Sequence, residues 1–211
     1  SDTTEDMANR IPGAERVAKC RPALLVTWCV AQAGSLTLGH VLYPELTVFR
    51  VAVQVIGIGY SYRIVPTWKG RRRLKDLYFF KNAMSTCGFV LTVFIYPLAA
   101  LGFTVSLPGG WVAVVMLAGF FVLFEHTYEI LYDMRDVQGD HKARVPTYPA
   151  VHGMDRARQI IDGLLIAAAT VVLIGVGTGS LGLREGLLVG APLIQFFFYR
   201  WRLRGGLTGR D

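Results

Sequence analysis

The sequence has few cysteines, and it contains none of the patterns in which cysteine carries chemistry. Cys20, Cys29 and Cys87 are the three, and no CxxC pair or cysteine–histidine spacing is present. This argues against a zinc site and against a disulfide framework. No low-complexity tract or clear internal repeat stands out, and residues 1–12 are too polar for a cleavable signal peptide. We therefore expect a single domain over residues 1–211.

Polar punctuation is also scarce. Of the 211 residues, 53% are hydrophobic, and the mean hydropathy is +0.41, which is unusual for a soluble domain of this size. A bilayer core of ~30 Å needs about 20 mostly apolar residues per helix. The sequence predicts an all-α, polytopic transmembrane helical bundle of about six to seven helices. The apolar stretches are 22–42, 46–62, 77–103, 111–131, 159–179 and 181–199.

Basic residues are nearly absent from one side of this predicted bundle. If the stretches cross a membrane in turn, one side receives 1–21, 63–76, 132–158 and 200–211. With Lys81 just inside the third stretch, that side holds every one of the 22 Lys and Arg residues except Arg50 and Arg184. This positive-inside pattern predicts that the basic side is cytoplasmic. The net charge of +7 is thus a topology signal and does not indicate a nucleic-acid partner.

Acidic residues gather where the fourth apolar stretch ends. On a helix that turns 100° per residue, Glu129, Asp133, Asp136 and Asp140 fall within a stripe about 60° wide. Two carboxylates ~4 Å apart repel by about 4 kcal/mol at an effective dielectric near 20, so protons or cations must relieve the stripe. Oxygen ligands without sulfur favour a hard cation, and Mg²⁺ binds through one or two carboxylates plus substrate phosphates. A solvated helix end that merely flanks the membrane is the alternative.

A second acidic pair lies on the same predicted side. Asp2 and Asp6 are four residues apart and would share one helix face. Between the two acidic groups in sequence lies the basic stretch "KGRRRLKDLYFFKN", which includes Lys75, Lys81 and Asn82. Carboxylates for a metal and cations for phosphate together indicate a diphosphate ligand. Topology determination and contact with anionic lipid are the alternative roles of the arginine run.

Three segments resemble the UbiA superfamily of intramembrane prenyltransferases. "YDMRDVQGDHKARVPTYPAVHG" resembles the second aspartate motif, DxxDxxxD followed by Thr-x-Pro. "DTTEDMANRIPG" resembles the end of the first motif, and "YSYRIVPTWKGRRRLKDLYFFKN" resembles the Tyr-Ser and Lys-Asn stretch between the motifs. The order of the segments and their shared side strengthen the likeness. Because the chain begins inside the first motif, we expect it to lack counterparts of the family's helices before that motif.

The resemblance implies a site for magnesium and a prenyl diphosphate. By position, Asp2 and Asp6 would hold one Mg²⁺, and Asp133, Asp136 and Asp140 would hold another; these five are also the expected catalytic residues. The expected substrate-binding residues are Tyr60, Ser61, Lys75, Lys81, Asn82 and Lys142. The implied partners are a prenyl diphosphate, an unidentified acceptor and membrane lipid.

The resemblance implies an enzyme that ionises the allylic diphosphate and transfers the prenyl group to an aromatic or other lipid-soluble acceptor. A membrane terpene cyclase, in which the cation attacks its own chain, is a rival with the same site. A non-catalytic membrane bundle or transporter-like protein is a rival of another class, although neither an internal repeat nor a broken mid-membrane helix is apparent.

Overall fold

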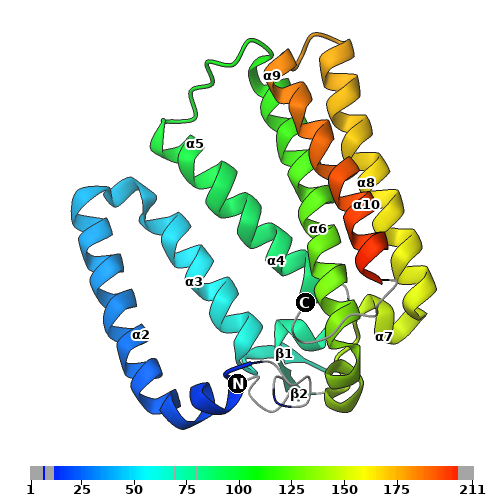
Figure 1. The fold of residues 1–211 in the computed structure, drawn as a ribbon. Coiled ribbons are helices and arrows are strands. Elements are labelled where there is room, and N and C mark those ends of the chain that lie inside the picture. The colour runs from blue at the N-terminus through cyan, green and yellow to red at the C-terminus, as the bar shows by residue number, and fades with distance from the viewer. Residues whose placement is uncertain (1–6, 8–11, 69, 79, 204–211) are drawn as a thin grey trace.

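The computed structural model describes residues 7, 12–68, 70–78 and 80–203, and these form a bundle whose helices alternate in direction along the chain (Figure 1). The longer helices are α2 (Ala14–Leu42), α3 (Thr47–Ser61), α4 (Phe80–Val90), α6 (Gly110–Ala143), α8 (Met154–Gly177) and α10 (Gly190–Leu203). The shorter ones are α5 (Tyr96–Ala100), α7 (Tyr148–His152) and α9 (Leu183–Gly186), with 3₁₀ turns at Pro44–Leu46, Leu74–Asp76 and Leu187–Val189. The prediction of an all-α membrane bundle is confirmed.

Each of the six predicted apolar stretches is largely helical, but not all are equally long. Four helical segments are long and apolar enough to cross a membrane: Ala14–Leu42, Phe80–Ala100, Gly110–Ala143 and Met154–Gly177. The other two stretches correspond to α3, with 15 residues, and α10, with 14. At 1.5 Å per residue, α3 is about 22 Å long, which is less than the ~30 Å of a bilayer core.

Two of the predicted stretches are interrupted. The stretch 77–103 forms α4, then a π-helical turn over Leu91–Ile95, then α5. Pro97 lacks the N–H that would bond back along the helix, and the widened turn lies directly before it. The stretch 181–199 divides into α9, a 3₁₀ turn and α10, because Gly190 and Pro192 fall where α10 begins. A proline fits the first turn of a helix and does not fit its interior.

The best packed part of the fold lies between α6, α8 and α10. One cluster of buried side chains joins α6 to the start of α8 and the end of α10, and a second joins the other half of α6 to α8. By contrast, no residue in the apolar window of α2 is buried, and α2 lies with α3 at the opposite edge of the bundle (Figure 1). The first cluster consists of Ile130, Met134, Ala157, Ile161, Leu165 and Tyr199.

A short β-hairpin, which the sequence analysis did not predict, precedes α4. Strands β1 (Val65–Thr67) and β2 (Gly70–Arg72) pair antiparallel, with Val65 opposite Arg72. Gly70 has φ of +101°, a backbone conformation that favours glycine. The hairpin lies at the same end of the bundle as α7 and the last turns of α6, and we call this the aspartate end (Figure 1). Segments 63–76 and 132–158, predicted to share one membrane side, therefore share one end of the fold.

The packing between α6 and α8 predicts the effect of a cavity. Ile161 is completely buried, so Ile161→Ala would leave a cavity, and the side chains around it would lose van der Waals contacts. The free energy of unfolding in detergent should therefore fall by about 2 kcal/mol or more. Ile166 on the same helix is 62% exposed, and Ile166→Ala should change that free energy little. Thermal or denaturant unfolding compares the two variants, and equal losses of stability would contradict this view of the core.

Candidate active site

Helix α6 is long enough to cross a membrane and to place the aspartates at the membrane boundary. Its 34 residues extend about 51 Å, against ~30 Å for a bilayer core. The helix continues without a break from the apolar residues through Asp133 and Asp140 and ends where Arg144 adopts a left-handed conformation before Pro146. The sequence analysis assumed that this helix continued through the acidic stripe, and that assumption is confirmed.

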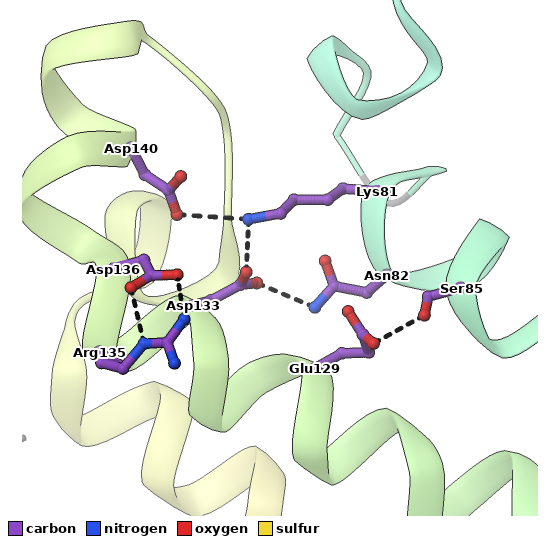
Figure 2. A network of polar contacts seen from close by, with 8 residues as sticks. All are labelled: Lys81, Asn82, Ser85, Glu129, Asp133, Arg135, Asp136 and Asp140. Atoms are coloured by element: carbon purple, nitrogen blue, oxygen red, sulfur yellow. Dashed lines mark hydrogen bonds and ion pairs between the residues drawn. The ribbon is translucent and has the colours of Figure 1, made fainter. Parts of the chain in front are cut away.

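Lys81 joins two of the aspartates. It is the second residue of α4, and its Nζ lies 2.6 Å from Asp133 Oδ1 and 3.4 Å from Asp140 Oδ2. Figure 2 shows its ammonium between the two carboxylates, which lie two turns apart on α6. The side chains are 15% exposed for Lys81, 2% for Asp133 and 8% for Asp140. Buried charges of this kind are stable only when they are paired and hydrogen-bonded.

Two further polar residues of α4 face the acidic stripe. Asn82, which is buried, donates from Nδ2 to Asp133 Oδ2 at 2.9 Å. Ser85 donates from Oγ to Glu129 Oε1 at 2.6 Å. Ser85 lies four residues after Lys81 and three after Asn82, so the three side chains share one side of α4, which faces α6 (Figure 2). Asp133 thus accepts hydrogen bonds on both of its carboxylate oxygens.

Asp136 does not join this group. Its two oxygens accept hydrogen bonds at 2.8 Å from Nε and Nη2 of Arg135, the residue directly before it (Figure 2). The guanidinium of Arg135 also lies 5.1 Å from the centre of the Tyr132 ring. The acidic stripe is therefore divided: Lys81 holds Asp133 and Asp140, whereas Arg135 holds Asp136.

Histidines and tyrosines connect this region with α7. Thr86 Oγ1 lies 3.3 Å from His126 Nδ1, and His126 Nε2 lies 3.3 Å from the Tyr148 hydroxyl. The Tyr78 hydroxyl lies 2.6 Å from His152 Nε2. Burial raises the pKa of the Tyr148 phenol, and the nearby Tyr78 and Asp133 raise it further, so the phenol remains neutral at physiological pH.

An ion pair fixes the loop that leads into α4. Arg73 donates to Asp76 through Nε at 2.9 Å and through Nη2 at 2.7 Å, and the Arg73 backbone N–H adds a bond at 3.1 Å. Burial alone would raise the pKa of Asp76, but these hydrogen bonds and the guanidinium charge outweigh it, so the pKa lies below its usual value. The pair orders the 3₁₀ turn that holds Lys75, which is 4% exposed.

The described site residues that the sequence predicted fall into three groups, apart from Lys75, which is buried in the turn before α4. Lys81 contacts both Asp133 and Asp140, and Asn82 contacts Asp133. Tyr60, half-buried at the end of α3, interacts electrostatically with Lys81, and half-buried Ser61 follows it. Lys142 is exposed beyond the stripe, and Asp136 is held by Arg135. The predictions for Asp2 and Asp6 lie outside the described residues.

Sequence reasoning missed several polar neighbours of the aspartates. Ser85 and Thr86 carry no charge, and their signal was only their helical spacing from Lys81 and Asn82. Arg135 was treated as part of the basic topology signal, because adjacent residues on a helix do not face each other. Thr147, in the Thr-x-Pro turn, is 1% exposed and lies near Asp140, and its buried hydroxyl has no hydrogen-bond partner among the described residues.

Aromatic residues on another side of α6 line a groove against α10. The groove has a volume of about 540 Å³, and Phe124, Tyr128 and Tyr132 contribute to it from α6. Phe198 and Tyr199 contribute from α10. Phe120 is 1% exposed and belongs to the core instead. The groove is therefore predominantly apolar, with Arg135 and Arg202 among its lining residues.

The donor set at Lys81 suits a hard cation. Asp133 and Asp140 offer carboxylate oxygens that reach a common point, since one ammonium contacts both. Mg²⁺ typically binds proteins through one or two carboxylates and completes its shell with water and phosphate. Within the part of the chain that the structure describes, no three His, Cys, Asp or Glu side chains form a metal cluster. The fit is thus to a cation that shares its ligands with a substrate.

The chain belongs to the UbiA prenyltransferase family, whose model matches residues 5–208. Membership agrees with the resemblance noted from the motifs, with the apolar helices of an integral membrane protein and with a prenyltransferase-type function. No curated protein and no solved structure matches the chain.

The hydrogen bond from Asn82 to Asp133 predicts a measurable loss of stability. Asn82→Ala removes a donor from a buried carboxylate and should lower the free energy of unfolding by about 1.5–3 kcal/mol. Thr92→Ala is the matched control, because the hydrogen bonds of exposed Thr92 within the described residues go to carbonyls of its own helical segment. Unfolding in detergent with EDTA measures both; if Asn82→Ala unfolds like Thr92→Ala, the bond to Asp133 contributes nothing.

Proposed function

We propose that this protein transfers a prenyl group from a prenyl diphosphate to a lipid-soluble acceptor, with Mg²⁺ as the cofactor. The observation that carries the proposal is the convergence of Asp133, Asp140 and Lys81 at the end of a membrane helix, in a chain of the UbiA prenyltransferase family. Two carboxylates and a lysine at one point supply both charges that a metal–diphosphate complex needs. The excess of basic residues supports a cytoplasmic position for the aspartate end.

The reaction begins with loss of the diphosphate from an allylic carbon. Negative charge grows on the leaving pyrophosphate, and donors fixed near that charge stabilise the transition state. Lys81 is the described cation best placed for this role, because it already lies at the carboxylates. Tyr60 lies near it at the end of α3 and would contact the same group.

Asp133 and Asp140 would hold the metal, and Asp136 would join them once Arg135 releases it. When bound, Mg²⁺ supplies positive charge that neutralises the diphosphate and makes it a better leaving group. Asn82 would keep Asp133 oriented through its bond to the second carboxylate oxygen. We propose that Asp2 and Asp6, by their likeness to the first motif, hold a further ion.

The allylic cation must be kept from water until it meets the acceptor. Apolar helices surrounding the acidic end supply that exclusion, and aromatic faces stabilise cations at short range. The aromatic side chains of α6 that line the groove against α10 are candidates for contact with the isoprenoid tail.

The proposal is tested by pyrophosphate release from the purified protein with Mg²⁺ and geranylgeranyl or farnesyl diphosphate, with and without a panel of acceptors. Asp133→Asn should lower release on the order of 100-fold or more, since even outer partners of metal ligands are worth 10–100-fold. Asp136→Asn should also lower it. Asp155→Asn is the control, because the Asp155 side chain is 92% exposed on α8.

The products separate the candidate functions. Release that requires an acceptor and yields a prenylated product supports the transferase. Cyclic apolar products formed without an acceptor indicate a terpene cyclase with the same ionisation site. Release that persists unchanged in Asp133→Asn and Asp136→Asn would overturn the site assignment, and no release from any diphosphate would leave a non-catalytic bundle.

A further inference from the structure

We propose that Lys81 is an internal counter-cation. In the metal-free protein, its ammonium holds Asp133 and Asp140 together at the point where a divalent cation binds, and it leaves for the diphosphate when that cation arrives. The diphosphate half of this inference rests on the proposed function. The metal half concerns binding alone and can be tested without turnover.

The contacts of Lys81 are those of a cation shared between two ligands. Its Nζ lies 2.6 Å from Asp133 and 3.4 Å from Asp140, and these two aspartates lie two turns apart on α6. Without a cation between them, the two buried carboxylates would repel each other. The lysine therefore keeps the carboxylates converged, and Figure 2 shows its ammonium between them.

Among the residues that the structure describes, the charges at this point do not balance. Asp133 and Asp140 share one ammonium, and the further donor to Asp133 is the neutral amide of Asn82. Arg135 is engaged with Asp136 on the next position of the helix. A divalent cation in place of the ammonium would balance two carboxylates fully. The exchange also leaves a positive charge available for a second anion.

The side chain of Lys81 suits such an exchange. A lysine ammonium is a compact charge on a flexible four-carbon stem, whereas an arginine would bind a carboxylate in a fixed, two-pronged geometry. Lys81 lies in the first turn of α4, where its side chain is 15% exposed. Asn82 beside it is only 2% exposed and fixes Asp133 from the other side. The ammonium can move while the carboxylate stays in place.

The exchange couples metal binding to diphosphate binding. A metal that binds alone must break the ion pairs of a buried lysine and leave its charge without those partners. Diphosphate supplies a new partner for the displaced ammonium, so each ligand strengthens the binding of the other. Metal alone should therefore bind the wild-type protein more weakly than it binds a variant without the lysine charge.

The test measures Mn²⁺ binding to the purified protein without substrate, and electron paramagnetic resonance reports how much Mn²⁺ is bound. Lys81→Met should bind Mn²⁺ between about 5-fold and 150-fold more tightly than the wild type, the usual range for coupled sites. It should also be less stable in EDTA and gain more from added Mn²⁺. Lys81→Arg keeps the positive charge and should show no such tightening. The Mn²⁺ binding that is lost in Asp133→Asn is the binding that belongs to this site.

Lys19→Met is the matched control, because Lys19 is exposed on α2 and should leave Mn²⁺ binding unchanged. Equal or weaker Mn²⁺ binding by Lys81→Met would overturn the inference, even if the protein proves to be a prenyltransferase. Conversely, tighter binding in a protein that releases no pyrophosphate would support the exchange and reject the proposed function.

A measurement on the wild-type chain covers the case in which Lys81→Met does not fold. Amine-reactive labelling, quantified by mass spectrometry, reports how free the Lys81 ammonium is. Mg²⁺ should increase labelling of Lys81, and inorganic pyrophosphate added with Mg²⁺ should decrease it again. Labelling of Lys19 serves as the internal reference. If Mg²⁺ does not change Lys81 labelling relative to Lys19, the ammonium is not displaced.

Discussion

A carboxylate taken out of water at the end of a membrane helix needs cations and donors, and in this chain α4 supplies them to α6. Asp133 is 2% exposed, and both of its oxygens are bonded, one to Lys81 and the other to Asn82. Losing one member of such a buried group is costly, because the remaining charge stays behind without a partner. The position of α4 against α6 thus determines whether the acidic end can remain folded in an apolar setting.

The framework on the other side of α6 makes this arrangement possible. Buried Ile130 and Met134 pack toward α8 and α10, on the turns that also carry the acidic residues. One side of these turns is therefore fixed by close packing, while the other presents oxygen atoms to α4. Packing that tolerates little displacement holds the carboxylates in register, and a ligand can then bind without reorganising the backbone.

How much of this the sequence predicts depends on the range of the contact. Apolar length predicted the helices and their alternation, and charges inside or beside apolar stretches singled out Asp133, Asp140 and Lys81. The resemblance to the family's Lys-Asn stretch added Asn82. The breaks at the start of α10 and before α5 come from prolines and glycines whose effect depends on local packing. The contact of Arg135 with Asp136 was missed because adjacent residues on a helix are not expected to face each other, yet the long Arg135 side chain turns back onto Asp136. The hydrogen bond from Ser85 to Glu129 was missed because a hydroxyl carries no charge.

Division of the acidic stripe between two cations gives the site its asymmetry. Lys81 comes from another helix and can leave without unfolding α6, whereas Arg135 belongs to α6 and stays beside Asp136 even when it lets go. Asp133 and Asp140 are therefore coupled to the position of α4, and Asp136 is coupled to a residue on its own helix. A ligand that draws all three carboxylates together must compete with two different ion pairs. The free energy that it gains by binding has to exceed the free energy of both ion pairs that it breaks. A metal–diphosphate complex carries both signs of charge, so it can pair with the displaced cations as well as with the carboxylates.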